Sequence, residues 1–245
     1  TAQFARIRRG MRGCRPLGND WDRAFADFYD VGHRGDEAFL DDTRQALAEM
    51  GNTRARRGAP SFAKFRRALV EGRLFAIITA RSHSAASIRK GVEYFIRRVL
   101  TTAEKRRMAR NLRGYIAYFD GDPRDLTDAQ VVAQYLDLCR YRGVTSPEFQ
   151  VLMGRKLGGS ESPEEAKQFA IREFVQHAIG LIGGRRRHEP ISIGFSDDDR
   201  RNIEAVEGFL RTELAREFPG VRFAVYDTSD PRRAHGRKIV IKEAR

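Results

Sequence analysis

The 245-residue chain has few of the residues that would assign it to a specialised class of protein. Its two cysteines exclude a disulfide scaffold, so we expect a reducing compartment, the cytoplasm. No apolar run approaches the ~20 residues of a membrane span, and the first residues lack the apolar core of a signal peptide. Nucleotide-binding loops of the Gly-x-Gly-x-x-Gly or Walker type are also missing. We therefore expect a cytoplasmic protein without membrane contact.

Positive charge, in contrast, is abundant. Lys and Arg number 46 against 33 Asp and Glu, which gives a formal net charge of +13 and a pI near 10.3. A positive field raises the local concentration of anions, so it favours a phosphorylated substrate or a nucleic acid as partner. The basic residues gather at 6–15, 54–57 and 185–187 rather than in one tail. An Arg-rich surface without a nucleic-acid partner is the alternative.

Apolar residues make up 41% of the chain, enough for a folded core, and strand-like runs alternate with helical patterns. This alternation predicts an α/β fold with a doubly wound parallel sheet. We expect the core to comprise 74–119 and 163–245, with helical, cap-like segments at 1–73 and 120–162. The expected strands are 74–78, 115–119, 191–195, 221–226 and 238–241, and the expected helices are 20–50, 61–72, 84–100, 128–142, 163–182 and 201–216.

In such folds the ligands lie beyond the carboxyl ends of the strands. The first expected strand leads into Thr79, Ala80 and Arg81, just before a helix begins. A hydroxyl beside the free amides of a helix N-terminus can bind a phosphate group. The alternative is that these polar residues only cap the helix. His83, in the same loop, is the histidine best placed to contact a substrate.

A second polar cluster follows the strand expected at 191–195. Asp197, Asp198 and Asp199 stand in a row, and oxygen ligands of this kind suit Mg²⁺, which takes one or two carboxylates together with substrate phosphate. The alternative is an acidic N-cap favoured by the helix dipole. Lys167 lies in the first turns of the helix at 163–182, where a cation opposes the dipole. It is a solvated surface residue unless an anion lies above it.

The order of these residues resembles the haloacid dehalogenase (HAD) superfamily, in which a strand-end Thr or Ser, a Lys near a helix start and an acidic strand end follow one another. The resemblance covers roughly 72–226. It implies a Rossmannoid core with Thr79 and Lys167 as catalytic residues, and substrate phosphate held at Thr79, Ala80 and Arg81. It also implies Mg²⁺ as cofactor, bound by Asp197 and Asp198.

The family's nucleophile motif, an apolar strand ending in Asp-x-Asp-x-Thr, has no match in this chain. Asp20 and Asp22 lack the strand and the Thr, 41–43 has the wrong spacing, and 227–230 follows a strand with the wrong spacing. Two hypotheses follow. The first is a Mg²⁺-dependent phosphohydrolase that works through an aspartyl-phosphate, with its nucleophile upstream of Thr1. The second is a catalytically inactive HAD-like module that binds RNA or a partner protein through its basic surface.

Overall fold

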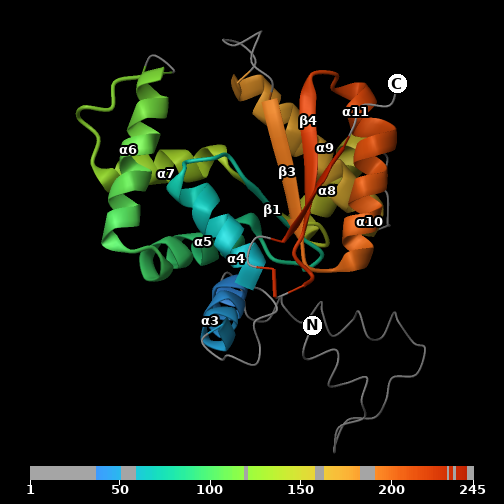
Figure 1. Ribbon diagram of the computed structural model, residues 1–245, viewed down its shortest axis with the longest axis horizontal. Helices are drawn as coiled ribbons and strands as arrows, with labels where there is room; N and C mark the ends of the chain where they lie inside the picture. The colour runs from blue at the N-terminus through green and yellow to red at the C-terminus, as the bar shows by residue number, and fades with distance from the viewer. Residues whose placement is uncertain are drawn as a thin grey trace, which may run out of the picture.

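The computed structural model describes residues 37–50, 59–118, 121–157, 163–182, 191–230, 232–233 and 236–241. The fold is mixed α/β and mostly helical, with a small parallel sheet component (Figure 1). In chain order the elements are α3 (Ala38–Met50), α4 (Ala59–Val70), β1 (Ala76–Thr79), α5 (Ala85–Val99), α6 (Thr102–Tyr118), α7 (Asp128–Leu138), β2 (Arg140–Gly143), α8 (Pro147–Leu157), α9 (Pro163–Ile182), β3 (Ile191–Asp197), α10 (Arg200–Phe209), the π-helix η3 (Leu210–Leu214), α11 (Ala215–Glu217), β4 (Val221–Asp227) and β5 (Arg237–Val240).

The described strands form two separate sheets. β1 pairs in parallel with β2, with Ala76 opposite Arg140. β3 pairs in parallel with β4, with Ile191 opposite Val221, and β5 joins β4 from the other side in the antiparallel sense. The sequence-based expectation of an α/β fold with parallel strands is therefore confirmed, but the described strands do not form one doubly wound parallel sheet, because they are divided between two sheets and β5 is antiparallel. Of the expected strands, those near 74–78, 191–195, 221–226 and 238–241 are present with small shifts at their ends.

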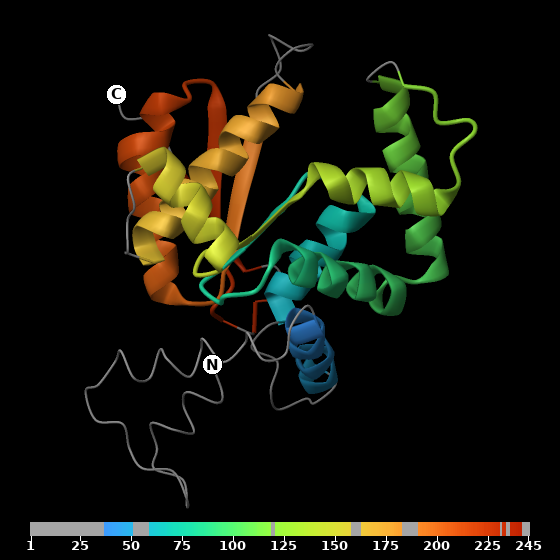
Figure 2. The ribbon, with the colours of Figure 1, turned by 180° about the vertical axis from the view of Figure 1, so that it is seen from behind.

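Each sheet has its own group of helices and its own core (Figure 2). Helices α4 to α7 pack with β1 and β2 around Phe95 and Met108. Helices α9 and α10 pack with β3 and β4 around Val175, Phe223 and Leu210. The helix expected at 84–100 is confirmed as α5, in which Ile88, Val92, Phe95 and Ile96 are buried. Ser84 caps the helix by accepting a hydrogen bond from the Ser87 amide.

The strand expected at 115–119 is wrong, because these residues up to Tyr118 belong to α6. Met108, Ala109 and Leu112 are buried along one side of this helix, and Ile116, which packs against the same core, continues that face. Tyr115 and Tyr118 are exposed. A short run of aromatic and β-branched residues has the composition of a strand, but the helical period of the preceding turns determines the structure here.

The helix expected at 128–142 is too long. α7 ends at Leu138, with Cys139 as its C-cap, and β2 follows at once. Two of the four residues of β2 are arginines, so the sequence lacks the apolar run that would predict a strand. Each arginine finds its partner on α9: Arg142 forms a bidentate pair with Glu173, and Arg140 binds His177 at 2.7 Å. Long-range ion pairing therefore stabilises a strand whose local propensity is weak.

Several sequence features lie outside the described residues, namely the basic groups at 6–15, 54–57 and 185–187 and the Asp20–Asp22 pair. Among the helices that the structure describes, none has the length and apolar character needed to cross a membrane.

Candidate functional site

The acidic cluster after β3 divides into two parts with different roles. Asp199 is the N-cap of α10, where its side chain accepts a hydrogen bond from the Arg201 amide at 2.8 Å. The side chain of Asp197 lies against the following backbone, where its Oδ1 accepts a hydrogen bond from the Asp199 amide at 2.8 Å. Asp198 is exposed beside it. The N-cap alternative thus applies to Asp199, and it leaves Asp197 and Asp198 for other chemistry.

Lys167 and Asp197 are joined through Asn202, on the first turn of α10. Lys167 Nζ donates to Asn202 Oδ1 at 2.9 Å, and Asn202 Nδ2 lies 3.4 Å from Asp197 Oδ1. Because an ammonium can only donate, it fixes the orientation of the amide and presents the NH₂ group to the carboxylate. Residues 35 positions apart in the sequence therefore meet at one strand end.

The carboxyl of Asp197 is in a poorly solvated position. Burial raises the pKa of Asp197 above its usual range, and the neighbouring charge of Asp198 adds to the rise. The hydrogen bonds from Asp199 and Asn202 and the charge of Lys167 act in the opposite direction without cancelling the effect of burial. A cation bound beside this carboxylate would stabilise its charged form by replacing the hydration lost on burial.

A second set of hydrogen bonds holds the backbone of Asp197. The carbonyl of Asp197 accepts from the Thr228 amide at 3.0 Å and from the Thr228 hydroxyl at 2.7 Å. Thr228 Oγ1 lies 2.6 Å from Ser61 Oγ, near the start of α4, and because the Thr228 proton is already donated, Ser61 is the donor. Thr228 is fully buried. Helix α4 is thereby attached to the loop that carries Asp197.

The residues after β1 have mostly local partners. Thr79 Oγ1 accepts a hydrogen bond from the Arg81 amide at 3.3 Å, and the Ala80 carbonyl accepts from Thr145 at 2.9 Å. The Arg81 side chain pairs with Asp42 of α3. Within the described residues, no hydrogen bond joins Thr79 to Lys167 or to Asp197.

His83, in the same loop, is 1% exposed, and its Nε2 lies 3.3 Å from a carboxylate oxygen of Asp42. Its ring also meets the ring of Phe39 edge-on. His83 is therefore a core histidine in this structure.

Thr79 nevertheless lies at the same edge as the Lys167 cluster. Ile78, the residue before it, packs against the apolar cluster that contains Ala166, next to Lys167. In Figure 1, β1 and β3 both run toward the lower edge of the molecule. β1 and β3 belong to separate sheets, so Thr79 and Asp197 share the side of the molecule at which their strands end, without a described contact between them.

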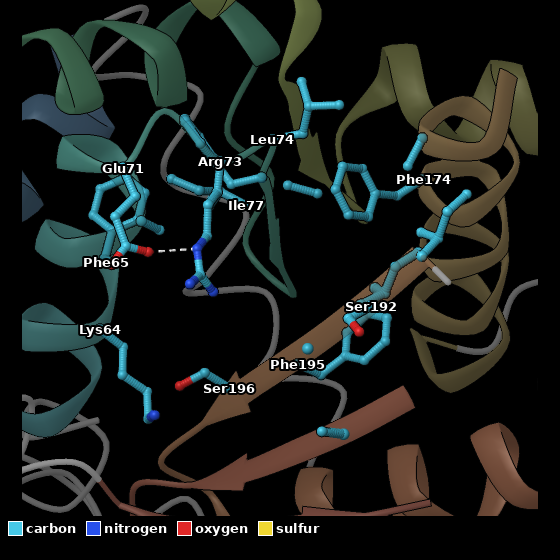
Figure 3. Close-up of a pocket in the computed structure, with 18 of the residues that line it drawn as sticks. Lys64, Phe65, Glu71, Arg73, Leu74, Ile77, Phe174, Ser192, Phe195 and Ser196 are labelled. Atoms are coloured by element: carbon cyan, nitrogen blue, oxygen red, sulfur yellow. Dashed lines mark ion pairs between the residues drawn. The ribbon is translucent and has the colours of Figure 1, made fainter. Parts of the chain in front are cut away.

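A groove of about 2020 Å³ separates the two sheets. Its walls include the strand residues 74–78 on one side and 191–197 on the other, together with Lys167 and Asn202 (Figure 3). Neither β1 nor β3 has a strand partner on the groove side among the described elements. The groove therefore lies between two open sheet edges.

The ladder patterns show which backbone groups line these edges. The carbonyls of Phe75 and Thr79 accept from the β2 side, so the intervening Ala76 and Ile78 direct their N–H and C=O groups into the groove. The Asp197 carbonyl accepts from the β4 side. Ser192, Gly194 and Ser196 alternate with Asp197 along β3, so their N–H and C=O groups point into the groove. Two rows of backbone groups thus face one space, and such groups require partners when they are buried.

Two carboxylates at the end of β3 have the chemistry of magnesium ligands. Carboxylate oxygens from one or two side chains, with water and phosphate, are the usual Mg²⁺ environment, and the desolvated Asp197 with the neighbouring Asp198 fits that pattern. Groups of three or more His, Cys, Asp or Glu suited to a metal are absent from the part of the chain that the structure describes. A complete site therefore needs oxygen ligands beyond these two side chains.

Comparison with known proteins adds no assignment. No protein-family model matches the chain, and neither curated proteins nor solved structures give a significant match. Sequence reasoning did not assign roles to Asn202, Thr228 or Ser61, which orient Lys167 and Asp197. The one local signal was the position of Asn202 three residues after Asp199 on the first turn of a helix.

Proposed function

We propose that this chain provides the Rossmannoid core and part of the active site of a HAD-type, Mg²⁺-dependent phosphohydrolase that acts on a phosphate ester. The observation that carries the proposal is the Lys167–Asn202–Asp197 cluster at the edge where β1 ends on Thr79. A hydroxyl at the end of β1, and an ammonium and a desolvated carboxylate at the end of β3, match the needs of phosphoryl transfer, in which charge on the transferred group must be stabilised.

In this proposal each residue has a separate task. Thr79, with the backbone of Ala80 and Arg81, binds the phosphoryl oxygens. Lys167 stabilises the charge that develops on them, and Asn202 keeps the ammonium and the Asp197 carboxylate in register. Asp197 and Asp198 would hold Mg²⁺, which supplies charge neutralisation on the phosphoryl oxygens when it is bound.

The nucleophile comes from outside the described residues. The open edges of β1 and β3 give it a place, because a strand between them would pair with both and end beside Thr79 and Asp197. An Asp at the end of that strand would attack phosphorus and release the alcohol, and water would then hydrolyse the aspartyl-phosphate. The proposal therefore requires an apolar strand ending in a carboxylate in the intact gene product.

The test is hydrolysis of p-nitrophenyl phosphate by the intact gene product, with and without Mg²⁺. We expect Mg²⁺-dependent turnover that falls by about a hundredfold in Asp197→Asn. Asp122→Asn is the matched control, because Asp122 is exposed and pairs with Arg124 in a loop between α6 and α7. Equal turnover of wild type and Asp197→Asn would show that the metal assignment is wrong. The absence of turnover, together with salt-sensitive RNA binding, would favour the inactive module instead.

A further inference from the structure

Two lysines converge on one aromatic ring at the rim of the groove. Lys64 of α4 places its Nζ 3.5 Å from the centroid of the Tyr226 ring, and Lys238 of β5 places its Nζ 5.9 Å from the same centroid. Helix α4, which is distant in the sequence, and the consecutive strands β4 and β5 therefore contribute to one site. Figure 3 shows the Lys64 side chain extending into the groove toward Ser196, one residue before Asp197.

The position of Tyr226 depends on a glycine. A Cβ at Gly194 would lie 2.7 Å from the Tyr226 ring, so the ring can pack against β3 only because this position has no side chain. With one side of the ring against the strand, Lys64 lies over the ring in a cation–π contact. The ring therefore acts as a support that holds the ammonium at the carboxyl end of the sheet.

The lysines are not neutralised by acidic side chains. Neither Lys64 nor Lys238 forms an ion pair with a carboxylate among the residues that the structure describes. Glu71, directly after α4, is engaged with Arg67 and Arg73. Burial lowers the pKa of Lys64, and the charges of Arg67, Lys238 and Arg73 lower it further. Like charges held together in a partly buried place are unfavourable unless an anion joins them.

We propose that Lys64 and Lys238 form an anion subsite that binds a second phosphate group of the substrate, beside the scissile one. The assignment of the scissile phosphate rests on the proposed function. Both lysines line the same groove as Lys167 and Asp197. They lie on the face of the sheet that carries Gly194, Ser196 and Tyr226, whereas Asp197 projects from the other face, so a molecule that contacts both sets extends around the end of β3. The substrate class is accordingly a compound with at least two phosphate groups, and a simple monophosphate ester leaves the subsite empty.

The test measures binding of inorganic pyrophosphate by calorimetry in EDTA, so that it does not depend on catalysis. We expect Lys64→Gln to weaken binding about tenfold and Lys238→Gln to weaken it severalfold, because each loses a charge-assisted contact. Lys64→Arg, which keeps the charge, restores most of the affinity. Lys90→Gln is the matched control, because Lys90 is exposed, pairs with Glu37 and does not line the groove. This variant should bind pyrophosphate as the wild type does.

The outcomes separate this inference from the proposed function. Pyrophosphate binding that depends on Lys64 and Lys238 supports the subsite even in a protein that hydrolyses no phosphate ester. Absence of binding by the wild type, or equal weakening by Lys90→Gln, overturns it. If Lys64→Gln does not fold, the exposed Lys238 carries the test alone, and an unchanged affinity in Lys238→Gln then refutes the subsite.

Discussion

Replacing Asp197 by Asn should stabilise the protein at neutral pH. The asparagine keeps an oxygen that can accept from the Asp199 amide and from Asn202, and it removes the charge whose burial raises the pKa of the carboxyl. The remaining hydrogen bonds offset part of the cost of burying that charge. We therefore expect the free energy of unfolding to rise on the order of 1 kcal/mol at pH 7. For a chain of this size this corresponds to a Tm roughly 2–4 °C higher.

The pH dependence gives the sign of the effect. In the unfolded chain an Asp titrates near pH ~3.9. Because the folded-state pKa of Asp197 is raised, the folded protein binds this proton more tightly, and the contribution of Asp197 to stability is most favourable below the unfolded pKa. It declines as the pH rises through the interval between the two pKa values. The advantage of Asp197→Asn is therefore greatest at neutral pH and vanishes in acid.

Urea denaturation measures the free energy of unfolding of the wild type and of Asp197→Asn at pH 7 and at pH 3.5, with Asp122→Asn as control. Arg124 lowers the pKa of Asp122, so this control should show no gain at pH 7. Mg²⁺ at ten times its Kd should add about 1.4 kcal/mol to the wild type and much less to Asp197→Asn. If the wild type and Asp197→Asn are equally stable at pH 7, or if their difference in stability grows toward acid, the reasoning about burial is wrong.

Three further predictions concern the fold. Hydrogen bonds from Arg66 and from Thr101 lower the pKa of Glu104 to about 2, so Glu104→Gln should reduce stability by roughly 1–2 kcal/mol above pH ~5, and the loss should shrink as the pH falls toward 2 in acid–urea titrations. Burial raises the pKa of the Cys139 thiol to about 12, so in a variant without the other cysteine a thiol reagent should react only after urea unfolding; rapid native labelling would contradict this. A Cβ at Gly143 would lie 2.1 Å from a backbone carbonyl, so Gly143→Ala should lower the Tm by several degrees, whereas Gly154→Ala, with open space on a helix, should raise it slightly in thermal scans.

The parts of the fold that follow from local patterns were predictable. The amphipathic α5 and the apolar runs at β3 and β4 can be predicted from the local order of apolar and polar residues. β2 could not be predicted in this way, because Arg140 and Arg142 are acceptable in a strand only when Glu173 and His177 of α9 lie opposite. A sequence without coordinates does not show that pairing.

The candidate site also has some parts that the sequence predicts and others that only the structure shows. The acidic cluster and the capping role of Asp199 are local features that the sequence displays. The bridge from Lys167 through Asn202 to Asp197 joins the starts of two helices, and only the packing of α9 beside β3 brings the helices together. The attachment of Ser61 to Thr228 spans 167 positions and has no local signature at all.

The paired open edges of β1 and β3 also have a practical consequence for handling the protein. Unsatisfied strand edges recruit other chains, so a preparation without a strand between them is exposed to edge-to-edge aggregation. A short apolar peptide that pairs with both edges would cover them. Screening such peptides for reduced aggregation would test whether these edges accept a strand.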